Sequence, residues 1–556
     1  LTGLTMANSV LHGHCGIWVT HAPYLLFYPD ANGDDLPDGP PQVRLAGFGL
    51  EDTHSTVNGL AWGPDGWLYG AQGSTVTSHI TRPDVAKPGE TPLYLEGCAV
   101  WRYHPHSKQF EIFADGSGNT FGLHFDAEGR LFSGHNGGDT RGWHHIQEGL
   151  YLKQGISPGK FGPPTNPYSF GELGDMPSTH PIPRFTHNII MAEGTALPSR
   201  WQGLLLGTDP LHRKITASTR TAVGSTFSTT DVAPALSTDD ITFRPVYLTP
   251  SPDGSITIAD FREEYIAHGQ NYQGQIDPAT GRIYRLRGKD IPLEKDIHLA
   301  AKSDEDLIHA LSHPNLWHRQ TAVRLLAERK AKIPDATQRV AASGAHPALE
   351  ILWVLHQTGA LDDAFALQLL DHPSPLVRAW TVRLRGDAKQ LSPAFLQAVV
   401  ARCATEPSAE VRSQILSTSR RLPLEEALPL VAAVLIRDAD AEDAFIPMMA
   451  WFTLESHCAA SADKVIGWLE KQPDLWSRAI VRKHLTSRLM RRFAATGSRT
   501  DLIHCAKLLS PAPASEDRDA LMAGFEQAFQ GRPLPALPSE LAEALAKLGK
   551  GSLPLR

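Results

Sequence analysis

Histidine, arginine and aspartate residues stand in turns that flank short apolar runs in the first half of the chain. His54 precedes the run that leads into Gly-Pro-Asp-Gly at 63–66, His187 precedes a later run, and Arg244 and Asp260 flank another. A histidine can take the proton of a hydroxyl group, and an arginine can stabilise negative charge that develops on oxygen. These residue types predict a polar site for proton abstraction or for binding a small polar ligand.

The prediction rests on the combination, because a single such residue in a loop is more often a turn or capping group. The residues predicted to be catalytic are His54, Arg244 and Asp260. The residues predicted to bind substrate or cofactor occupy equivalent places around neighbouring runs; they are Asn58, Gln72, Asn119, His187, Asp209 and Arg262.

A separate acidic loop has oxygen-bearing side chains at its positions 1, 3, 5 and 9, which are Asp30, Asn32, Asp34 and Asp38. Alternating oxygen ligands in a tight turn are typical of Ca²⁺ loops. Position 6 is Asp35 instead of glycine, and no glutamate stands at position 12. The loop is therefore interpreted either as a structural calcium site or as a solvated acidic hairpin tip.

The elements that must position these residues are short strands in residues 1–290, which are rich in glycine, proline and aromatic residues. A glycine-containing turn followed by four or five strand-like residues recurs at intervals of roughly 50 to 75 residues, the size of one four-stranded propeller blade. The turns at 63–66, 126–129 and 251–254 are nearly alike. The pattern predicts a β-propeller over 1–290, with a β-sandwich as the alternative.

Five such signatures occur, so the prediction is a propeller of the six-bladed type whose first blade is missing or incomplete. The open edge at Leu1 would then need another segment or chain, or a distorted closure.

Residues 291–302 are predicted to be a linker, and residues 303–556 an all-α solenoid of HEAT type. Pro314, Pro347, Pro373 and Pro407 stand 33, 26 and 34 residues apart, and each precedes an amphipathic helical run. Such an interval is that of a helix pair that buries its apolar face on its neighbours. The predicted buried positions include Leu311, Val323, Leu326, Leu355, Val382 and Leu416, and residues 510–540 are interpreted as a proline-rich interruption.

Composition excludes several classes of function. A formal net charge of −8 provides no basic field for nucleic acid. The five cysteines form no Cys-x-x-Cys pair, which excludes a zinc ribbon and a c-type haem attachment. The sequence has no run of 18 or more apolar residues, so no membrane span is predicted. The N-terminus has no signal-peptide pattern, and the chain is interpreted as a mature or trimmed fragment.

The runs YLLFYPDANGDDLPDG, GLEDTHSTVNGLAWGPDGWLYG, GSGNTFGLHFDAEGRLF and SPDGSITIADF resemble the membrane-bound dehydrogenase proteins of planctomycetes and verrucomicrobia. These are six-bladed relatives of soluble quinoprotein sorbosone and glucose dehydrogenases, commonly followed by HEAT repeats. The resemblance implies that His54 is the base that takes the substrate proton while pyrroloquinoline quinone accepts hydride. It also implies an arginine that polarises the quinone, yet Gly118 stands at that position, with Arg244 as a conjectured substitute.

The leading hypothesis is a sugar or polyol oxidoreductase of quinoprotein type, with pyrroloquinoline quinone and Ca²⁺ as candidate cofactors and no haem in this chain. It implies an exported protein, periplasmic or at the cell surface, with a small carbohydrate or polyol as substrate and a protein partner on the solenoid. The alternatives are a metal-dependent carbohydrate or ester hydrolase or lyase at the same site, and a non-catalytic glycan- or protein-binding module.

Overall fold

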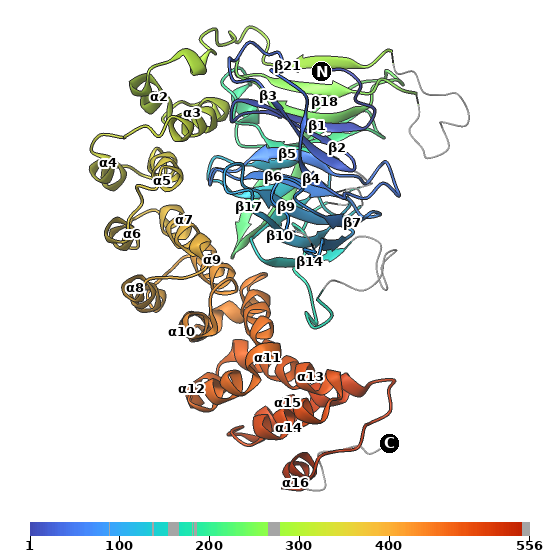
Figure 1. Ribbon diagram of the computed structural model, residues 1–556, viewed down its shortest axis with the longest axis vertical. Coiled ribbons are helices and arrows are strands. Elements are labelled where there is room, and N and C mark those ends of the chain that lie inside the picture. Colours follow the sequence, from blue (N-terminus) through green and yellow to red (C-terminus); the bar gives the residue numbers. More distant parts are fainter. Residues whose placement is uncertain are drawn as a thin grey trace. The chain divides into compact units, whose positions relative to one another are not determined.

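The computed structural model describes residues 1–87, 89–135, 138–153, 166–180, 182, 186–264 and 279–547. Strands occupy the N-terminal part, up to residue 286, and helices occupy the remainder (Figure 1). The chain divides into two compact units: the first contains 1–165, 174–365 and 372–377, and the second contains 166–173, 366–371 and 378–556. The change from strands to helices therefore precedes the division into units, because the first four α-helices belong to the first unit.

Five sheets of three or more strands, antiparallel except for one strand pair, follow one another along the sequence, and the N-terminal half is propeller-like. The first sheet contains β1 (Ala7–His12), β2 (Gly16–His21), β3 (Tyr24–Pro29) and β4 (Gln42–Ala46). The second contains β5 (Asn58–Trp62), β6 (Leu68–Gln72), β9 (Ala99–Tyr103) and β10 (Phe110–Ser117), and β14 (Gly149–Lys153) pairs in parallel with β10.

The third sheet contains β11 (Leu123–Phe125), β12 (Leu131–Ser133) and β13 (Trp143–His145). The fourth contains β15 (Ile189–Met191), β16 (Leu205–Asp209), β17 (Lys214–Val223) and β18 (Thr226–Ser237). The fifth contains β19 (Pro245–Pro250), β20 (Ile256–Asp260) and β21 (Arg282–Leu286), and β7 (Thr77–Ile80) and β8 (Leu93–Glu96) form a separate hairpin. The predicted blade number and ring closure stay predictions.

The turns read from the sequence form as tight hairpins. Gly66 has φ of +83° and Gly254 has φ of +84°, and each amide donates a hydrogen bond to the residue three positions earlier, Gly63 and Ser251. Only glycine adopts such positive φ values readily, which is why these positions end the turns.

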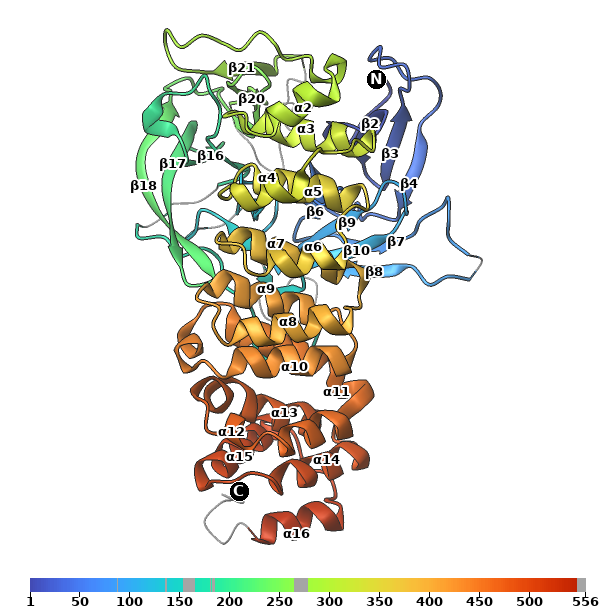
Figure 2. The same cartoon turned by 90° about the vertical axis from the view of Figure 1, so that its left-hand side faces the viewer.

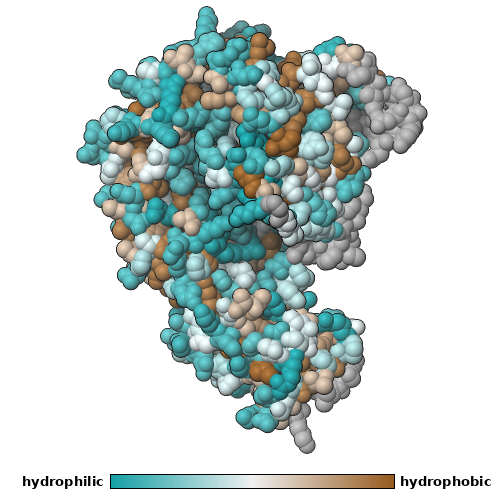
Figure 3. Space-filling view, viewed as in Figure 1, coloured by the Kyte–Doolittle hydropathy of each residue, from teal (hydrophilic) through white to brown (hydrophobic). Residues whose placement is uncertain are grey.

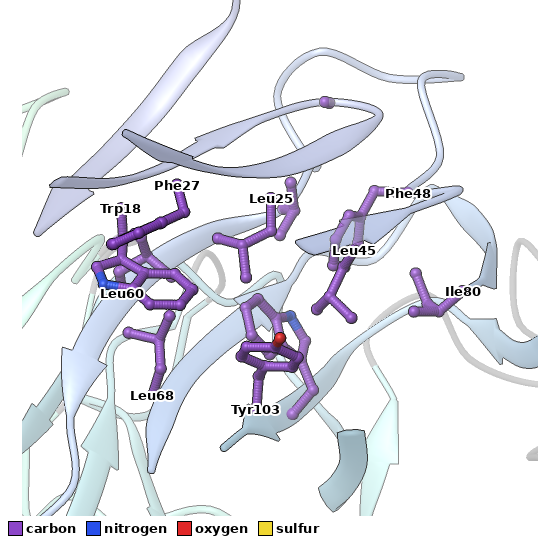
Figure 4. Close-up of a cluster of buried hydrophobic side chains, with 12 residues drawn as sticks. Trp18, Leu25, Phe27, Leu45, Phe48, Leu60, Leu68, Ile80 and Tyr103 are labelled. Carbon is purple, nitrogen blue, oxygen red and sulfur yellow. The ribbon is translucent and has the colours of Figure 1, made fainter. Parts of the chain in front are cut away.

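Successive sheets pack face to face through apolar side chains. Between the first two sheets, Trp18, Leu25, Phe27 and Leu45 meet Leu60, Leu68, Trp101 and Tyr103 (Figure 4). A second cluster joins the fourth sheet to the fifth through Ile190, Leu206, Ile215, Leu248, Ile256 and Ile258. This packing fixes the order of the sheets.

The helical part contains 15 α-helices among the described residues. In the first unit they are α2 (Asp304–Ala310), α3 (Leu316–Glu328), α4 (Ala336–Ala342) and α5 (Ala348–Gln357); α6 (Asp363–Leu369) and α7 (Pro375–Arg385) cross the unit boundaries. The second unit continues with α8 (Pro393–Cys403), α9 (Ala409–Ser419), α10 (Leu424–Leu435), α11 (Ile446–Glu470), α12 (Pro473–Trp476), α13 (Thr486–Thr496), α14 (Arg499–Leu509), α15 (Ser515–Phe529) and α16 (Ser539–Lys547).

Short helical turns join some of these elements: η1 (Ser199–Trp201), η2 (Leu299–Ala301), η3 (Gly386–Ala388) and η4 (Asp438–Glu442) are 3₁₀-helices, and η5 (Val481–Leu485) is a π-helix. Within each unit, helices adjacent in sequence lie side by side, as α2 with α3 and α13 with α14 (Figure 2). All six positions predicted to be buried are confirmed, since each is at most 8% exposed. HEAT repeats as such stay a prediction.

One expectation for the helical part is wrong. Residues 510–540 are not only an interruption, because α15 occupies Ser515–Phe529. The prolines lie outside this helix, with Pro511 and Pro513 before it and Pro533 after it. Proline is tolerated at those places because it removes no intrahelical hydrogen bond there.

Three buried ion pairs of one kind, here called the ion-pair ladder, recur along the helical part. Each arginine stands five residues after one of the prolines Pro314, Pro373 and Pro407. Its carboxylate partner stands at the start of a turn later in the chain. The pairs are Arg319 with Glu350 at 3.0 Å, Arg378 with Glu406 at 2.6 Å, and Arg412 with Asp440 at 2.5 Å.

Candidate functional site

The first strands of successive sheets form a row, in which β5 packs on β1 and β11, and β15 packs on β11 and β19. The residues that precede these strands are linked across sheets by side-chain to backbone hydrogen bonds. Asn58 donates to the carbonyl of Thr120 at 3.0 Å and accepts from the amide of Gly122 at 3.1 Å, and Asn188 accepts from the amide of Leu248 at 2.7 Å. The predicted binding residue Asn58 is therefore engaged in joining two sheets.

His54 lies in the loop before β5, and its side chain is 47% exposed. Its Nδ1 lies 3.3 Å from Oδ1 of Asp52, which also accepts the His54 amide at 2.9 Å. Burial alone would raise the pKa of Asp52, but hydrogen bonds from Thr75, at 2.5 Å, and from the His54 amide hold it below its usual range. Asp52 is therefore an anion that orients the His54 ring and directs Nε2 away from itself.

His187 lies in the loop before β15, near enough to His54 for the two imidazoles to interact electrostatically. Its ring stacks on Phe121 with centroids 3.9 Å apart, and its Nδ1 lies 3.3 Å from the carbonyl of Val246. Burial, with a smaller contribution from His54, lowers the pKa of His187 to about 4.

We expect His187 to remain neutral throughout the physiological range, so NMR titration of its ring carbons should give a pKa near 4. The stacked Phe121→Leu variant, which exposes the ring, should move that value back toward 6.5. A wild-type value already near 6.5 would contradict the buried, stacked arrangement.

His135, which follows β12, was not among the residues predicted from the sequence. A Cβ atom added at Gly118 would lie 1.7 Å from Nδ1 of His135, so this imidazole fills the space beside the glycine. Trp143 Nε1 donates to the same Nδ1 at 3.4 Å, which leaves the proton of neutral His135 on Nε2. Burial lowers the pKa of His135 to about 4. A neutral hydrogen-bond donor thus occupies the place where the resemblance implies a cation.

Three other predicted binding residues are engaged with the protein itself. Asn119 accepts the amide of Ser74 at 2.8 Å. Gln72 is fully buried; its amide donates to the carbonyls of Val76 and Gly97, and its oxygen accepts from Ser78. Asp209 accepts from the amide and the ring of His212. These contacts shape the loops around the row of strands.

Arg244 and Asp260 form a second group at β19 and β20. Asp260 Oδ1 accepts the amides of Arg244 at 2.6 Å and Arg262 at 2.9 Å, whereas its buried Oδ2 has no partner among the described residues. The buried guanidinium of Arg244 donates to the carbonyls of Pro210, Phe243 and Glu264. Its two terminal nitrogens thus hold loop carbonyls, whereas its buried Nε has no partner among the described residues; Arg262 contributes a backbone amide.

The loop predicted to bind calcium folds on its own backbone. The carboxylate of Asp30 is buried and accepts the amides of Gly33, Asp34 and Asp35, and Asp38 accepts the amide of Ala31. The carboxylate oxygens of Asp30, Asp34 and Asp38 do not all lie within 4.8 Å of one another, as the ligand atoms of a metal site would among the described residues. The structure therefore does not bring this set together.

The group of described residues that does converge is Glu294, His313 and His318. The amide of Asn315 donates to Nδ1 of His313, which places the His313 proton on Nε2, 3.4 Å from Glu294. His318 Nε2 lies 3.0 Å from Glu294 and 2.9 Å from the carbonyl of Pro252, and a carbonyl only accepts. Both Nε2 atoms therefore carry hydrogens: His318 donates to the carbonyl of Pro252, and both rings lie beside the carboxylate of Glu294.

We expect Glu294→Gln to lower the free energy of unfolding by about 1–3 kcal/mol, because Thr195 and Asn315, which donate to this carboxylate, lose a charged acceptor. Added Zn²⁺ should leave the melting temperature of the wild-type chain unchanged. A rise of several degrees with Zn²⁺, abolished by Glu294→Gln, would show instead that the group binds metal.

Comparisons with known proteins extend over both halves. A family model described as a domain of unknown function, DUF7133, matches residues 1–290. A structure described as a putative oxidoreductase (glucose dehydrogenase) from Thermus thermophilus covers 51% of this chain and 97% of its own at 14% identity, with a TM-score of 0.29. The PQQ-bound aldose sugar dehydrogenase of Streptomyces coelicolor covers 49% and 74% at 16% identity, with a TM-score of 0.28.

A designed armadillo repeat protein covers 41% of this chain and all of its own at 17% identity, with a TM-score of 0.19. No activity or cofactor is transferred from these structures to this chain. No curated protein matches the sequence. None of the helices in the described residues is long and apolar enough to cross a membrane, and the face drawn in Figure 3 is largely hydrophilic.

Proposed function

This chain belongs to the DUF7133 family, and we propose that its sheet half is an oxidoreductase-like enzyme domain that acts on a hydroxyl group of a carbohydrate or polyol. The proposal rests on one observation, the pairing of the half-exposed His54 with the anionic Asp52 in the loop before β5. Export of the chain and a protein partner on its helices stay predictions of the sequence.

The pair has the arrangement that a general base requires. Asp52 accepts from Nδ1, so the lone pair of neutral His54 lies on Nε2, where a substrate hydroxyl can donate to it. When Nε2 takes the proton, the carboxylate of Asp52 stabilises the resulting imidazolium. Thr75 and the His54 amide keep that carboxylate anionic and in place.

The neighbouring imidazole of His187 suits this role because it is neutral. A cationic His187 would oppose protonation of His54, and burial against Phe121 removes that charge. His135 offers a neutral N–H donor from Nε2. Such a donor can hold a polar oxygen without forming a buried ion pair.

Oxidation of the alcohol also needs an acceptor for the hydride. Pyrroloquinoline quinone is the acceptor that the resemblance implies, and it is an anion whose carbonyl would be polarised by an arginine. His135 occupies the space at Gly118, and both terminal nitrogens of Arg244 are held by backbone carbonyls. The described residues therefore do not fit the quinone in that manner, and we derive no step through it; Ca²⁺ likewise stays a prediction.

The proposal is tested with the full chain on a panel of aldoses and polyols, using phenazine and indophenol dyes as electron acceptors. Parallel reactions receive pyrroloquinoline quinone and Ca²⁺, alone and together. We expect dye reduction with at least one substrate, and its dependence on quinone decides the cofactor. Absence of dye reduction, together with no calorimetric binding of any panel member, would contradict the proposal.

A further inference from the structure

The segment Asn166–Leu173 lies in sequence between β14 and β15, yet it packs as part of the helical second unit. We call it the latch segment. It contacts one face of two helices, formed by Trp451 and Glu455 of α11 and by Arg488, Arg491 and Arg492 of α13, which we call the α11–α13 face. Glu455 stands four residues after Trp451, and Arg491 and Arg492 stand three and four residues after Arg488, so these side chains share one side of each helix.

Two aromatic rings of the latch segment lie against arginines of this face. The guanidinium of Arg492 lies 3.8 Å from the ring centroid of Tyr168, and that of Arg491 lies 4.1 Å from the ring centroid of Phe170. Phe170 also stacks on Trp451 at 6.1 Å with the rings 20° apart. Cation–π contacts of this kind are stronger when they are shielded from water.

Polar groups of the face match the backbone of the latch segment. Trp451 Nε1 donates to the carbonyl of Ser169 at 2.6 Å, and Arg488 Nε donates to the carbonyl of Phe170 at 3.2 Å. Both donors are side chains that point at consecutive carbonyls. The α11–α13 face therefore binds backbone carbonyl groups as well as aromatic rings, as sites for extended peptides do.

One carboxylate of the face is shared between helix and latch. Glu455 is buried and receives Arg492 on Oε1 at 2.9 Å and the Asn166 side-chain amide on Oε2 at 2.7 Å. Asn166 in turn accepts the amide of Tyr168 at 2.9 Å, which starts the turn that presents the ring. The asparagine is thus recognised by its side chain.

Two backbone features support a specific contact between the latch segment and the α11–α13 face. Phe170 has φ of +48°, a conformation that bulky residues rarely adopt and that persists where surrounding contacts determine it. The π-helix η5 leads directly into α13, and π-helical turns often occur at functional sites. In that turn, Arg488 is braced by donating to the carbonyl of His484 at 2.8 Å.

We propose that the α11–α13 face is a recognition site for an extended peptide of the form Asn-Pro-aromatic-x-aromatic-Gly, and that the latch segment is its intramolecular ligand. The glycine follows from the space available, because a Cβ at Gly171 would lie 3.1 Å from the Met448 side chain. The inference does not depend on the proposed enzyme activity.

Hydrogen exchange of the full chain provides the first test. Peptides covering 166–173 should exchange at least tenfold more slowly than the same sequence as a free synthetic peptide. Tyr168→Ala with Phe170→Ala should remove that protection and leave β16 unchanged. The matched control Tyr168→Phe keeps the ring and should exchange as the wild type does. Exchange of the wild-type segment at the rate of the free peptide would overturn the proposal.

Binding in trans provides the second test, with a fluorescein-labelled peptide of residues 164–174 as probe. The double variant should bind it saturably and at least tenfold more tightly than the wild type, whose face is already occupied. Adding Arg488→Ala and Arg491→Ala should abolish this binding. No binding to the double variant, or equal binding to both chains, would refute recognition. A concentration-dependent dimer that exchanges the segment would refute the intramolecular part.

Discussion

His54→Ala is expected to lower turnover by about 10²–10⁴-fold while leaving the fold intact, because a positioned general base contributes that much to proton transfer. The side chain is 47% exposed and its ring contact is with Asp52, so its removal leaves no cavity in the core. The measurement is kcat/KM for the best substrate of the panel, with circular dichroism and the melting temperature recorded in parallel.

Two further variants separate the base from its orienting partner. Asp52→Asn keeps the shape but removes the charge that stabilises imidazolium, and we expect a loss of turnover, mainly in kcat. His79→Ala removes an exposed histidine from β7 and should have no effect. Turnover of His54→Ala within threefold of the wild-type value would show that another group takes the proton.

Local pattern was sufficient to predict the strands and most of the helices. The Pro-Asp-Gly turns require positive φ at the glycine, and that requirement is written in the sequence. The amphipathic runs after Pro314, Pro373 and Pro407 form α3, α7 and α9. Apolar residues spaced three and four apart lie on one face of a helix, and that face is buried against neighbouring helices.

The candidate site was less predictable, because the same polar residue types also satisfy buried backbone groups. Asn58 and Gln72 precede or end strands as ligands would, yet their amides serve Thr120 and Val76. His135 was missed in the sequence, because its place in the site depends on the space beside Gly118, which has no side chain. Such pairings connect loops far apart in sequence, and no local pattern encodes them.

The second prediction with a large expected effect concerns the free energy of unfolding and one ion pair of the ion-pair ladder. Arg378→Ala is expected to lower the free energy of unfolding by about 3–5 kcal/mol, because it removes the cation that hydrogen-bonds the buried carboxylate of Glu406 and leaves only Arg402, at 3.9 Å. The two groups form a double hydrogen bond at 2.7 and 2.6 Å, and their side chains are 5% and 1% exposed. Urea unfolding followed by the helical circular dichroism signal measures the loss.

Matched variants distinguish charge from packing. Arg378→Met with Glu406→Leu replaces the pair by apolar groups and should recover most of the loss, since no charge stays buried. Lys464→Ala, which breaks the exposed pair with Glu425, should change little. If Arg378→Ala cost no more than Lys464→Ala, the pair would not stabilise the helices.

The pH dependence of the Arg378→Ala loss follows from the same contact. Burial alone would raise the pKa of Glu406, but hydrogen bonds from Arg378 and the Ser408 amide lower it. In the wild type, this pair stabilises the fold above the usual glutamate range and loses that contribution as the pH falls through the lowered pKa. In Arg378→Ala burial dominates and raises the pKa, so protonation of Glu406 on acidification relieves the destabilisation. The difference in unfolding free energy between the two chains should therefore be largest near pH 7 and shrink toward pH 4. A difference that grows on acidification would contradict the assignment of Glu406 as the buried anion.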